Sequence, residues 1–158
     1  YDIISKKTAT LIASCTATGA KSSGADPDAI KKMKQFGLYA GIAFQIKDDL
    51  FDYEKTNLTG KPTGNDIKEK KFTLPLIHAM REASTDEQTL IRNAITDKSA
   101  HRLDEIVNAV QSCGSLAYTR SQAQQYHDRA LAQLQLLPES ASRTALERIT
   151  YLSIHRDR

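Results

Sequence analysis

The chain has 158 residues, of which 40% are hydrophobic and none is tryptophan, a composition typical of one globular domain with its own core. No apolar stretch reaches the roughly 18 residues of a membrane-spanning helix. A net charge of +3 is too small to indicate nucleic-acid binding. Cys15 and Cys113 fit no metal or redox spacing, so we expect reduced core thiols in a cytoplasmic protein.

Positive charge is concentrated at one end of the sequence. Residues 1–71 contain twelve of the thirteen lysines, no arginine and nine acids, whereas the remaining residues carry ten charges of each sign. This distribution has two interpretations: a solvated lysine-rich face, or a site at which lysines and a metal ion together hold a polyanion.

The first predicted helix covers residues 2–18. Ile4, Leu11 and Cys15 share one stripe of it at helical spacing, which indicates an apolar face. Gly19 follows directly and is the predicted end of this helix, because glycine is common just after a helix C-terminus.

A second, longer helix is predicted from Pro27 to about Tyr53. Asp26 is suited to cap its first turn, and proline is favoured at the first helical position because its missing N–H costs nothing there. Alternating steps of three and four residues mark an inward-facing stripe that consists of Phe36, Tyr39, Ala43, Ile46, Leu50 and Tyr53.

Three aspartates lie on a different face of this helix. Asp48 and Asp52 are one turn apart, with Asp49 beside them. Carboxylates about 4 Å apart repel by about 4 kcal/mol at an effective dielectric constant near 20, so a cation is expected among them. Mg²⁺ suits this arrangement, because it commonly binds through one or two carboxylates, substrate phosphates and water. The alternative is a solvated face on which the aspartates pair with neighbouring lysines.

A loop is predicted at residues 54–66, directly after the aspartates. It contains two glycines and a proline, which interrupt any helical pattern. Lys61 and Lys71 accompany this loop, while Lys7 and Thr8 lie on the first helix. Lysine is a flexible point charge suited to phosphate, and glycine lets the backbone approach a ligand closely. These residues are therefore candidates for binding a phosphate group.

Beyond the loop, every predicted element is a helix. One begins near Thr73, with Pro75 in its first turn. Amphipathic patterns predict further helices at residues 86–96, 99–112, 115–136 and 139–155. No convincing strand pattern occurs, so the sequence predicts an all-α domain.

Four segments resemble motifs of one enzyme family, the trans-isoprenyl (polyprenyl) diphosphate synthases. FQIKDDLFD resembles the second aspartate-rich motif, FQxxDDxxD, and KTATLIASCTATGA resembles the KTA segment upstream of it. GKPTGNDIKEKKFTLPLI is similar to the downstream stretch GKxxGxDIxEGKxTLPLI, and ITYLSIHRDR is similar to the C-terminal ending. Their order and spacing agree over essentially the whole chain.

The sequence departs from the family pattern in two places. Lys70 stands where the family usually has glycine, just before the final lysine of the downstream stretch. The first aspartate-rich motif, DDxxD followed by two arginines, lies upstream of the KTA segment in the family and has no match here. We therefore expect residues 1–158 to be the C-terminal half of such an enzyme, with the N-terminal half absent, and we do not expect this half to be active alone.

The resemblance implies an all-α helical bundle of the isoprenoid synthase type, with the aspartates facing a central cavity. It implies a prenyltransferase that condenses an allylic diphosphate with isopentenyl diphosphate to make an all-trans polyprenyl diphosphate. Mg²⁺ is the implied cofactor, a homodimer is the implied assembly at full length, and an octaprenyl-like product is one guess at chain length.

The resemblance also implies roles for single residues. Asp48 is the principal metal ligand, Asp52 supports it, and Asp49 takes part either from behind the ligands or through water. The implied substrate-binding residues are Lys7, Thr8, Phe44, Gln45, Lys61 and Lys71, and Lys7, Asp48 and Lys61 are the implied catalytic residues.

Three alternatives stay open at this point, one of which is a helical scaffold with a charged face, although it leaves the combination of motifs unexplained. A noncatalytic partner subunit or diphosphate-binding module of the same fold would retain this half of the site, which the missing first motif allows. A terpene cyclase shares the fold, although the GKPTGND and FTLPLI stretches favour a synthase by resemblance.

Overall fold

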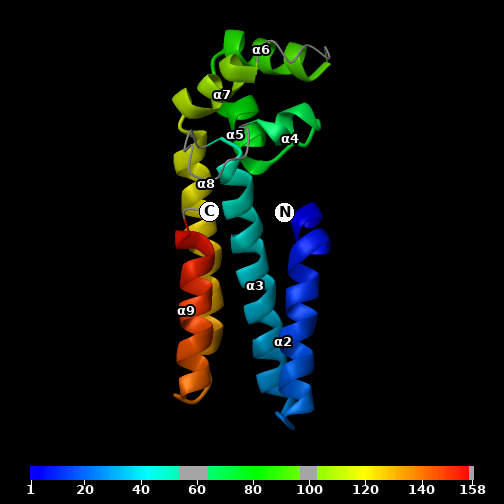
Figure 1. The fold of residues 1–158 in the computed structure, drawn as a ribbon, viewed down its shortest axis with the longest axis vertical. Coiled ribbons are helices and arrows are strands. Elements are labelled where there is room, and N and C mark those ends of the chain that lie inside the picture. The colour runs from blue at the N-terminus through cyan, green and yellow to red at the C-terminus, as the bar shows by residue number, and fades with distance from the viewer. Residues whose placement is uncertain (54–63, 97–102, 157–158) are drawn as a thin grey trace. The chain divides into compact units, whose positions relative to one another are not determined.

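The structure is a computed structural model that describes residues 1–53, 64–96 and 103–156. Every regular element in these ranges is a helix, and no strand occurs among the described residues, which confirms the predicted all-α class (Figure 1). None of the described helices combines the length and the apolar composition needed to cross a membrane.

The described chain forms two compact units. The first contains Tyr1–Lys47 and Gln122–Arg156, and the second contains Asp48–Ser121. The first unit is built from α1 (Asp2–Ile4), η1 (Ser5–Ala9), α2 (Thr10–Ser22), most of α3 (Pro27–Phe51), most of α8 (Ser115–Leu134) and α9 (Ala141–His155). The second is built from the end of α3, α4 (Asn65–Lys68), α5 (Leu74–Glu82), α6 (Thr85–Thr96), α7 (Leu103–Ser112) and the start of α8.

The first helix is longer than predicted and continues past Gly19. Its residues form α1, the π-helical segment η1 and α2 in succession, and α2 continues through Gly19 to Ser22. The chain leaves the helix at Gly24, which has a φ of 79°. The amide of Ala25 donates to the Ala20 carbonyl at 3.1 Å, a pairing that satisfies a terminal carbonyl group. The prediction that Gly19 ends the helix is therefore wrong.

The buried face of η1 and α2 also differs from the prediction. Leu11 is 69% exposed and Cys15 is exposed, whereas Ala9 and Ala13 are buried. These alanines face Gly41 and Gly37 of α3. A Cβ atom added to Gly41 would lie 2.6 Å from the Cα of Ala9, so the two helices approach too closely for a leucine side chain. The expected burial of Leu11 and the expected core thiol at Cys15 are wrong for this reason, whereas Ile4, the third residue of the predicted stripe, is partly buried.

Helix α3 matches its prediction at the start and along its buried stripe. Asp26 Oδ1 accepts hydrogen bonds from the amides of Asp28 and Ala29, both at 2.9 Å, so the predicted cap is confirmed. Five of the six predicted stripe residues are buried, and Tyr39 is partly buried. The part of this stripe in the first unit packs against α8 and α9 through a cluster that contains Phe36, Ala130, Leu134 and Leu146.

The second unit has a core of its own, formed mainly by α5, α6 and α7. Its largest fully buried side chains include Tyr53, Leu76, Ile91 and Ile106. Thr73 precedes α5 and Pro75 is in its first turn, as predicted. The short helix α4 was not predicted, and its Ile67 is buried in the same core.

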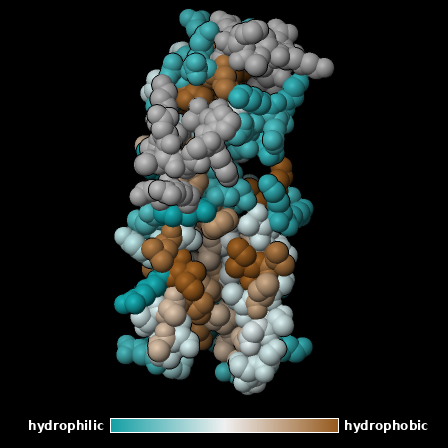
Figure 2. All heavy atoms as spheres, viewed as in Figure 1, coloured by the Kyte–Doolittle hydropathy of each residue, from teal (hydrophilic) through white to brown (hydrophobic). Residues whose placement is uncertain are grey.

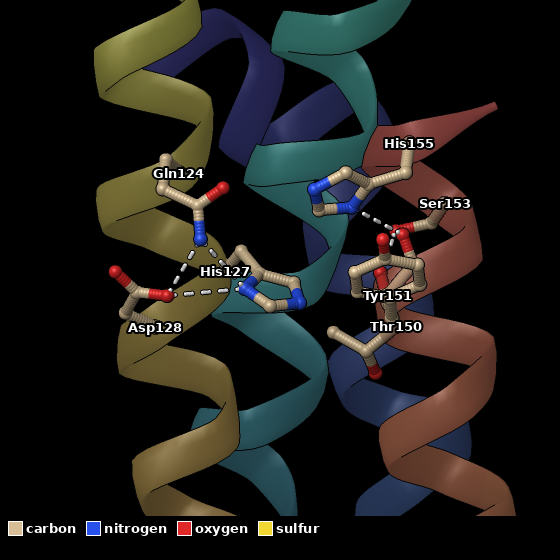
Figure 3. A network of polar contacts seen from close by, with 7 residues as sticks. All are labelled: Gln124, His127, Asp128, Thr150, Tyr151, Ser153 and His155. Carbon is tan, nitrogen blue, oxygen red and sulfur yellow. Dashed lines mark hydrogen bonds and ion pairs between the residues drawn. The ribbon is translucent and has the colours of Figure 1, made fainter. Parts of the chain in front are cut away.

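An aromatic contact joins α8 and α9 in the first unit. His127 is buried, and its ring extends from α8 toward α9 (Figure 3). Its Nδ1 lies 3.1 Å from Asp128 Oδ1, while its Nε2 has no hydrogen-bond partner among the described residues. On α9, the rings of Tyr151 and His155 stack with their centroids 3.9 Å apart. This contact therefore contains one buried nitrogen with no partner in the described part of the chain.

Apolar side chains are exposed on the outer surfaces of α2 and α9. They include Leu11 on α2 and Ile149 and Leu152 on α9, and Figure 2 shows hydrophobic surface over both helices. The described residues leave these side chains uncovered.

Candidate functional site

Thr8 and Gln45 are brought together in the first unit, although they are 37 positions apart. The Thr8 hydroxyl donates a hydrogen bond to Gln45 Oε1 at 2.8 Å, and both side chains are partly buried. Thr8 precedes the buried Ala9, and Gln45 lies one turn after Gly41. The close packing of Ala9 against Gly41 therefore sets the distance at which this hydrogen bond forms.

Lys7 lies in the π-helical segment η1 and its side chain is exposed. In this segment the amide of Thr10 bonds to the Ser5 carbonyl, and the Thr10 hydroxyl donates to the same oxygen at 2.8 Å. Segments of π-helix occur frequently at functional sites. The sequence pattern gave no sign of this irregularity at the predicted phosphate-binding residue.

Phe44 contacts the end of α9 within the first unit. The Arg156 guanidinium lies over the Phe44 ring, with Cζ 4.2 Å from the ring centroid, in the geometry of a cation–π interaction. The Arg156 Nε–H also donates to the Ser153 carbonyl at 3.1 Å. Arg156 was missed as a neighbour of the site, although it belongs to the ITYLSIHRDR segment that resembles the family ending.

Asp48 and Asp49 occupy the last turn of α3 in the second unit. This turn contains no basic residue, and the C-terminal end of a helix carries a partial negative charge that disfavours carboxylates. Asp48 is partly exposed, whereas Asp49 is only 7% exposed. A solvated acidic face is therefore the wrong interpretation for Asp49, and the local electrostatics favour a cation at this helix end.

Asp52 lies just beyond α3, because the helix ends at Phe51 rather than near Tyr53. Its Oδ1 accepts a hydrogen bond from the Asn65 amide at 2.8 Å, and its Oδ2 accepts one from the Asp66 amide at 2.9 Å. Burial raises the pKa of the Asp52 carboxyl, although these amides act in the opposite direction. The sequence pattern placed Asp52 on the helix with Asp48, whereas the structure directs its carboxylate to the start of α4.

The aspartates suit a cation that takes most of its ligands from elsewhere. Among the described residues, no three His, Cys, Asp or Glu side chains are arranged to hold a metal ion by themselves. Mg²⁺ usually keeps several waters and binds through one or two carboxylates together with phosphates. The oxygen donors at the end of α3 fit that kind of binding.

Of the two lysines that were predicted to bind phosphate after the aspartates, the structure describes only Lys71. Lys61 lies outside the described residues. Lys71 is exposed, and its Nζ forms ion pairs with Glu69 and, at 3.7 Å, with Asp66. The hydrogen bond and charge of Glu69 raise the pKa of Lys71, with a smaller effect of Asp66. Lys70, which replaces the family's usual glycine, has a φ of 56° in the left-handed region.

The short helix α4 was also missed, and with it the backbone amides that Asp52 binds. Gly64 has a φ of 78°, and atoms of the Leu103 side chain would lie within 2.8 Å of a Cβ atom built on it. The letters GND, a glycine followed by two residues that favour helix starts, are the signal that would have predicted it.

Comparison with known proteins gives a consistent result. The sequence profile of the family described as Polyprenyl synthetase matches residues 1–112. Octaprenyl diphosphate synthase of Escherichia coli (strain K12) is 37% identical over 158 residues, covering 99% of this chain and 49% of the relative. An all-trans-nonaprenyl-diphosphate synthase (geranyl-diphosphate specific) of Rhodobacter capsulatus is 37% identical over 155 residues. That match covers 98% of this chain and 47% of the relative. The chain thus spans about half the length of the curated relatives it matches.

Solved structures agree with these sequence matches. A polyprenyl synthase from Caulobacter crescentus CB15, complexed with calcium and isoprenyl diphosphate, has a TM-score of 0.90 at 33% identity. The similarity covers 99% of this chain and 48% of that one. A geranylgeranyl pyrophosphate synthase from Bacteroides thetaiotaomicron has a TM-score of 0.89 at 31% identity, and the similarity covers 98% of this chain and 52% of that one.

Proposed function

Because the chain belongs to the polyprenyl synthetase family, we propose that its residues form the C-terminal part of a trans-polyprenyl diphosphate synthase. In the proposed reaction the C–O bond of an allylic diphosphate breaks and pyrophosphate leaves. The double bond of isopentenyl diphosphate attacks the allylic cation, and loss of a proton yields a product one isoprene unit longer. The difficult step is the departure of a highly charged leaving group.

The observation that carries the proposal is the acidic end of α3. Asp48 and Asp49 lie at the helix end that disfavours anions, in a turn without a basic residue. We propose that Asp48 is the principal ligand of Mg²⁺, that Asp52 supports it and that Asp49 takes part through water. When bound, Mg²⁺ supplies charge stabilisation for the leaving diphosphate, an effect of several kcal/mol.

The other candidate residues act on the substrate itself. We propose that Lys7 and Lys61 bind the allylic diphosphate and that Lys71 assists them, since exposed ammonium groups suit phosphate oxygens. Thr8 and Gln45 line the reacting end, and their mutual hydrogen bond fixes the orientation of both side chains. Phe44, whose ring is covered on one side by the Arg156 guanidinium, contacts the prenyl chain.

Replacement of Asp48 tests this proposal. The native gene product is assayed with farnesyl diphosphate, labelled isopentenyl diphosphate and Mg²⁺, and the carbon number of the product is measured. We expect Asp48→Ala to lower turnover by about a hundredfold or more while the protein remains folded. The matched control is Asp28→Ala, which removes an exposed carboxylate from the opposite end of the same helix and should leave turnover unchanged.

Two results would contradict the proposal. Near-normal turnover of a folded Asp48→Ala protein would show that Asp48 is not a ligand of a catalytic metal ion. Diphosphate binding without any elongation by the native protein would favour a noncatalytic partner subunit, an alternative that the half-length match to the relatives keeps relevant. The product length, a cytoplasmic location and a homodimeric assembly remain predictions of the sequence.

A further inference from the structure

Three consecutive backbone amides converge on one aspartate in the second unit. The Gly64 amide donates to the Asp52 carbonyl at 2.9 Å. The Asn65 and Asp66 amides donate to the two carboxylate oxygens of Asp52 at 2.8 and 2.9 Å. Asp52 thereby joins the end of α3 to the start of α4.

These hydrogen bonds supply what α4 cannot supply locally. The first amides of a helix have no partner inside it and usually bond to the side chain of the preceding cap residue. The residue before α4 is Gly64, which has no side chain and a φ of 78°. A side chain there would also collide with Leu103, whose Cγ would lie 2.8 Å from the added Cβ. The cap must therefore come from elsewhere in the sequence, and Asp52 provides it.

The segment that Asp52 caps is connected to a proposed diphosphate ligand. Ile67 of α4 is buried in the core of the second unit. The amide of Lys71 donates to the Asp66 carbonyl at 2.7 Å, and the Lys71 ammonium group lies 3.7 Å from Asp66 Oδ1. Movement of Asp66 away from α3 would therefore also move Lys71.

We propose that Asp52 is a positioning residue, which holds Gly64–Asp66 against the end of α3 and supports the metal site by position rather than by coordination. Both of its carboxylate oxygens already accept charge-assisted hydrogen bonds, which are stronger than neutral ones. The metal is left to Asp48, with Asp49 beside it. The functional part of this inference rests on the proposed function, whereas the capping role does not.

Amide hydrogen exchange in metal-free protein tests the capping role directly. We expect Asp52→Ala to speed exchange at the Asn65 and Asp66 amides by about tenfold or more, as loss of a capping side chain does at a helix start. Asp48→Ala removes the same chemical group one turn earlier and should leave both amides protected. Unchanged exchange at Asn65 and Asp66 in Asp52→Ala would overturn the proposal.

Asp52→Asn gives a second, milder test that remains available if Asp52→Ala does not fold. Asparagine keeps one acceptor oxygen, so one of the two amides should stay protected while the other exchanges faster. If both amides of Asp52→Asn exchanged as slowly as they do in the wild type, the capping role would be contradicted.

Kinetics separate positioning from coordination. In Asp52→Asn we expect a higher KM for the allylic diphosphate, while the Mg²⁺ concentration at half-maximal rate stays within about twofold of the wild-type value. A rise of about tenfold or more in that Mg²⁺ concentration, with unchanged exchange, would assign Asp52 to the metal and overturn the proposal. If the native protein shows no elongation, the proposed function fails, and the exchange data still decide the role of Asp52.

Discussion

Gly41 of α3 packs directly against η1 and the start of α2 and has no room for a side chain. A Cβ atom at this position would lie 2.6 Å from the Cα of Ala9 and 2.9 Å from its Cβ. Carbon atoms in contact prefer a separation of about 3.5–4.0 Å, so Gly41→Ala should push the two helices apart by about 1 Å. Overpacking of this kind costs about 1–3 kcal/mol of unfolding free energy. The displacement also stretches the 2.8 Å hydrogen bond between Thr8 and Gln45 beyond hydrogen-bond distance.

Urea unfolding and steady-state kinetics of the same variant check both effects. We expect Gly41→Ala to lose stability and turnover together, because the packing that stabilises the unit also positions Thr8. Gly19→Ala is the matched control: Gly19 lies inside α2 with no atom within 4 Å of an added Cβ. In that variant the free energy of unfolding should rise by about 0.5–1 kcal/mol, the usual stability difference between alanine and glycine inside a helix. A Gly41→Ala protein as stable as the wild type would refute the close-packing argument.

Two further predictions concern residues in unusual environments. Lys70 has a φ of 56°, in the left-handed region that glycine adopts without strain. In thermal unfolding, Lys70→Gly should therefore be neutral or slightly stabilising, whereas Lys70→Val should lower the free energy of unfolding by about 1–2 kcal/mol. Equal effects of the two substitutions would contradict a strained backbone at Lys70. The buried Nε2 of His127 has no hydrogen-bond partner among the described residues, an arrangement that costs about 1–3 kcal/mol of stability. We therefore expect that His127→Phe does not lower the unfolding temperature, although it loses the contact with Asp128. A large loss of stability in His127→Phe would mean that Nε2 has a partner.

The helix starts were predictable wherever a single residue fixes the local backbone. Asp26 gave the start of α3 and Pro75 gave the start of α5, because a capping side chain and a proline each act within one turn. Gly19 gave a wrong helix end, because glycine is tolerated inside a helix and only Gly24 adopts the left-handed conformation that ends α2.

The buried face of η1 and α2 could not be predicted from hydrophobicity alone. The stripe with Leu11 was the more apolar choice, yet the structure buries Ala9 and Ala13. This choice is decided by Gly37 and Gly41 on another helix, which allow a backbone approach that only small residues can fill. The spacing of those two glycines was visible in the sequence, but its meaning depends on which helix packs against them.

The three aspartates of the DDLFD segment show why a motif identifies a site more readily than it assigns roles. Their spacing treats Asp48 and Asp52 as equivalent neighbours on one helix face. The helix ends at Phe51, so Asp48 stays on the helix, partly exposed, while the Asp52 carboxylate turns to the amides of α4. Helical periodicity contains no information about a partner thirteen positions away, and burial separates the residues further, since Asp49 is only 7% exposed. One acidic pattern therefore gives three different environments, and only Asp48 combines an accessible carboxylate with the electrostatics of a helix end that favours a cation.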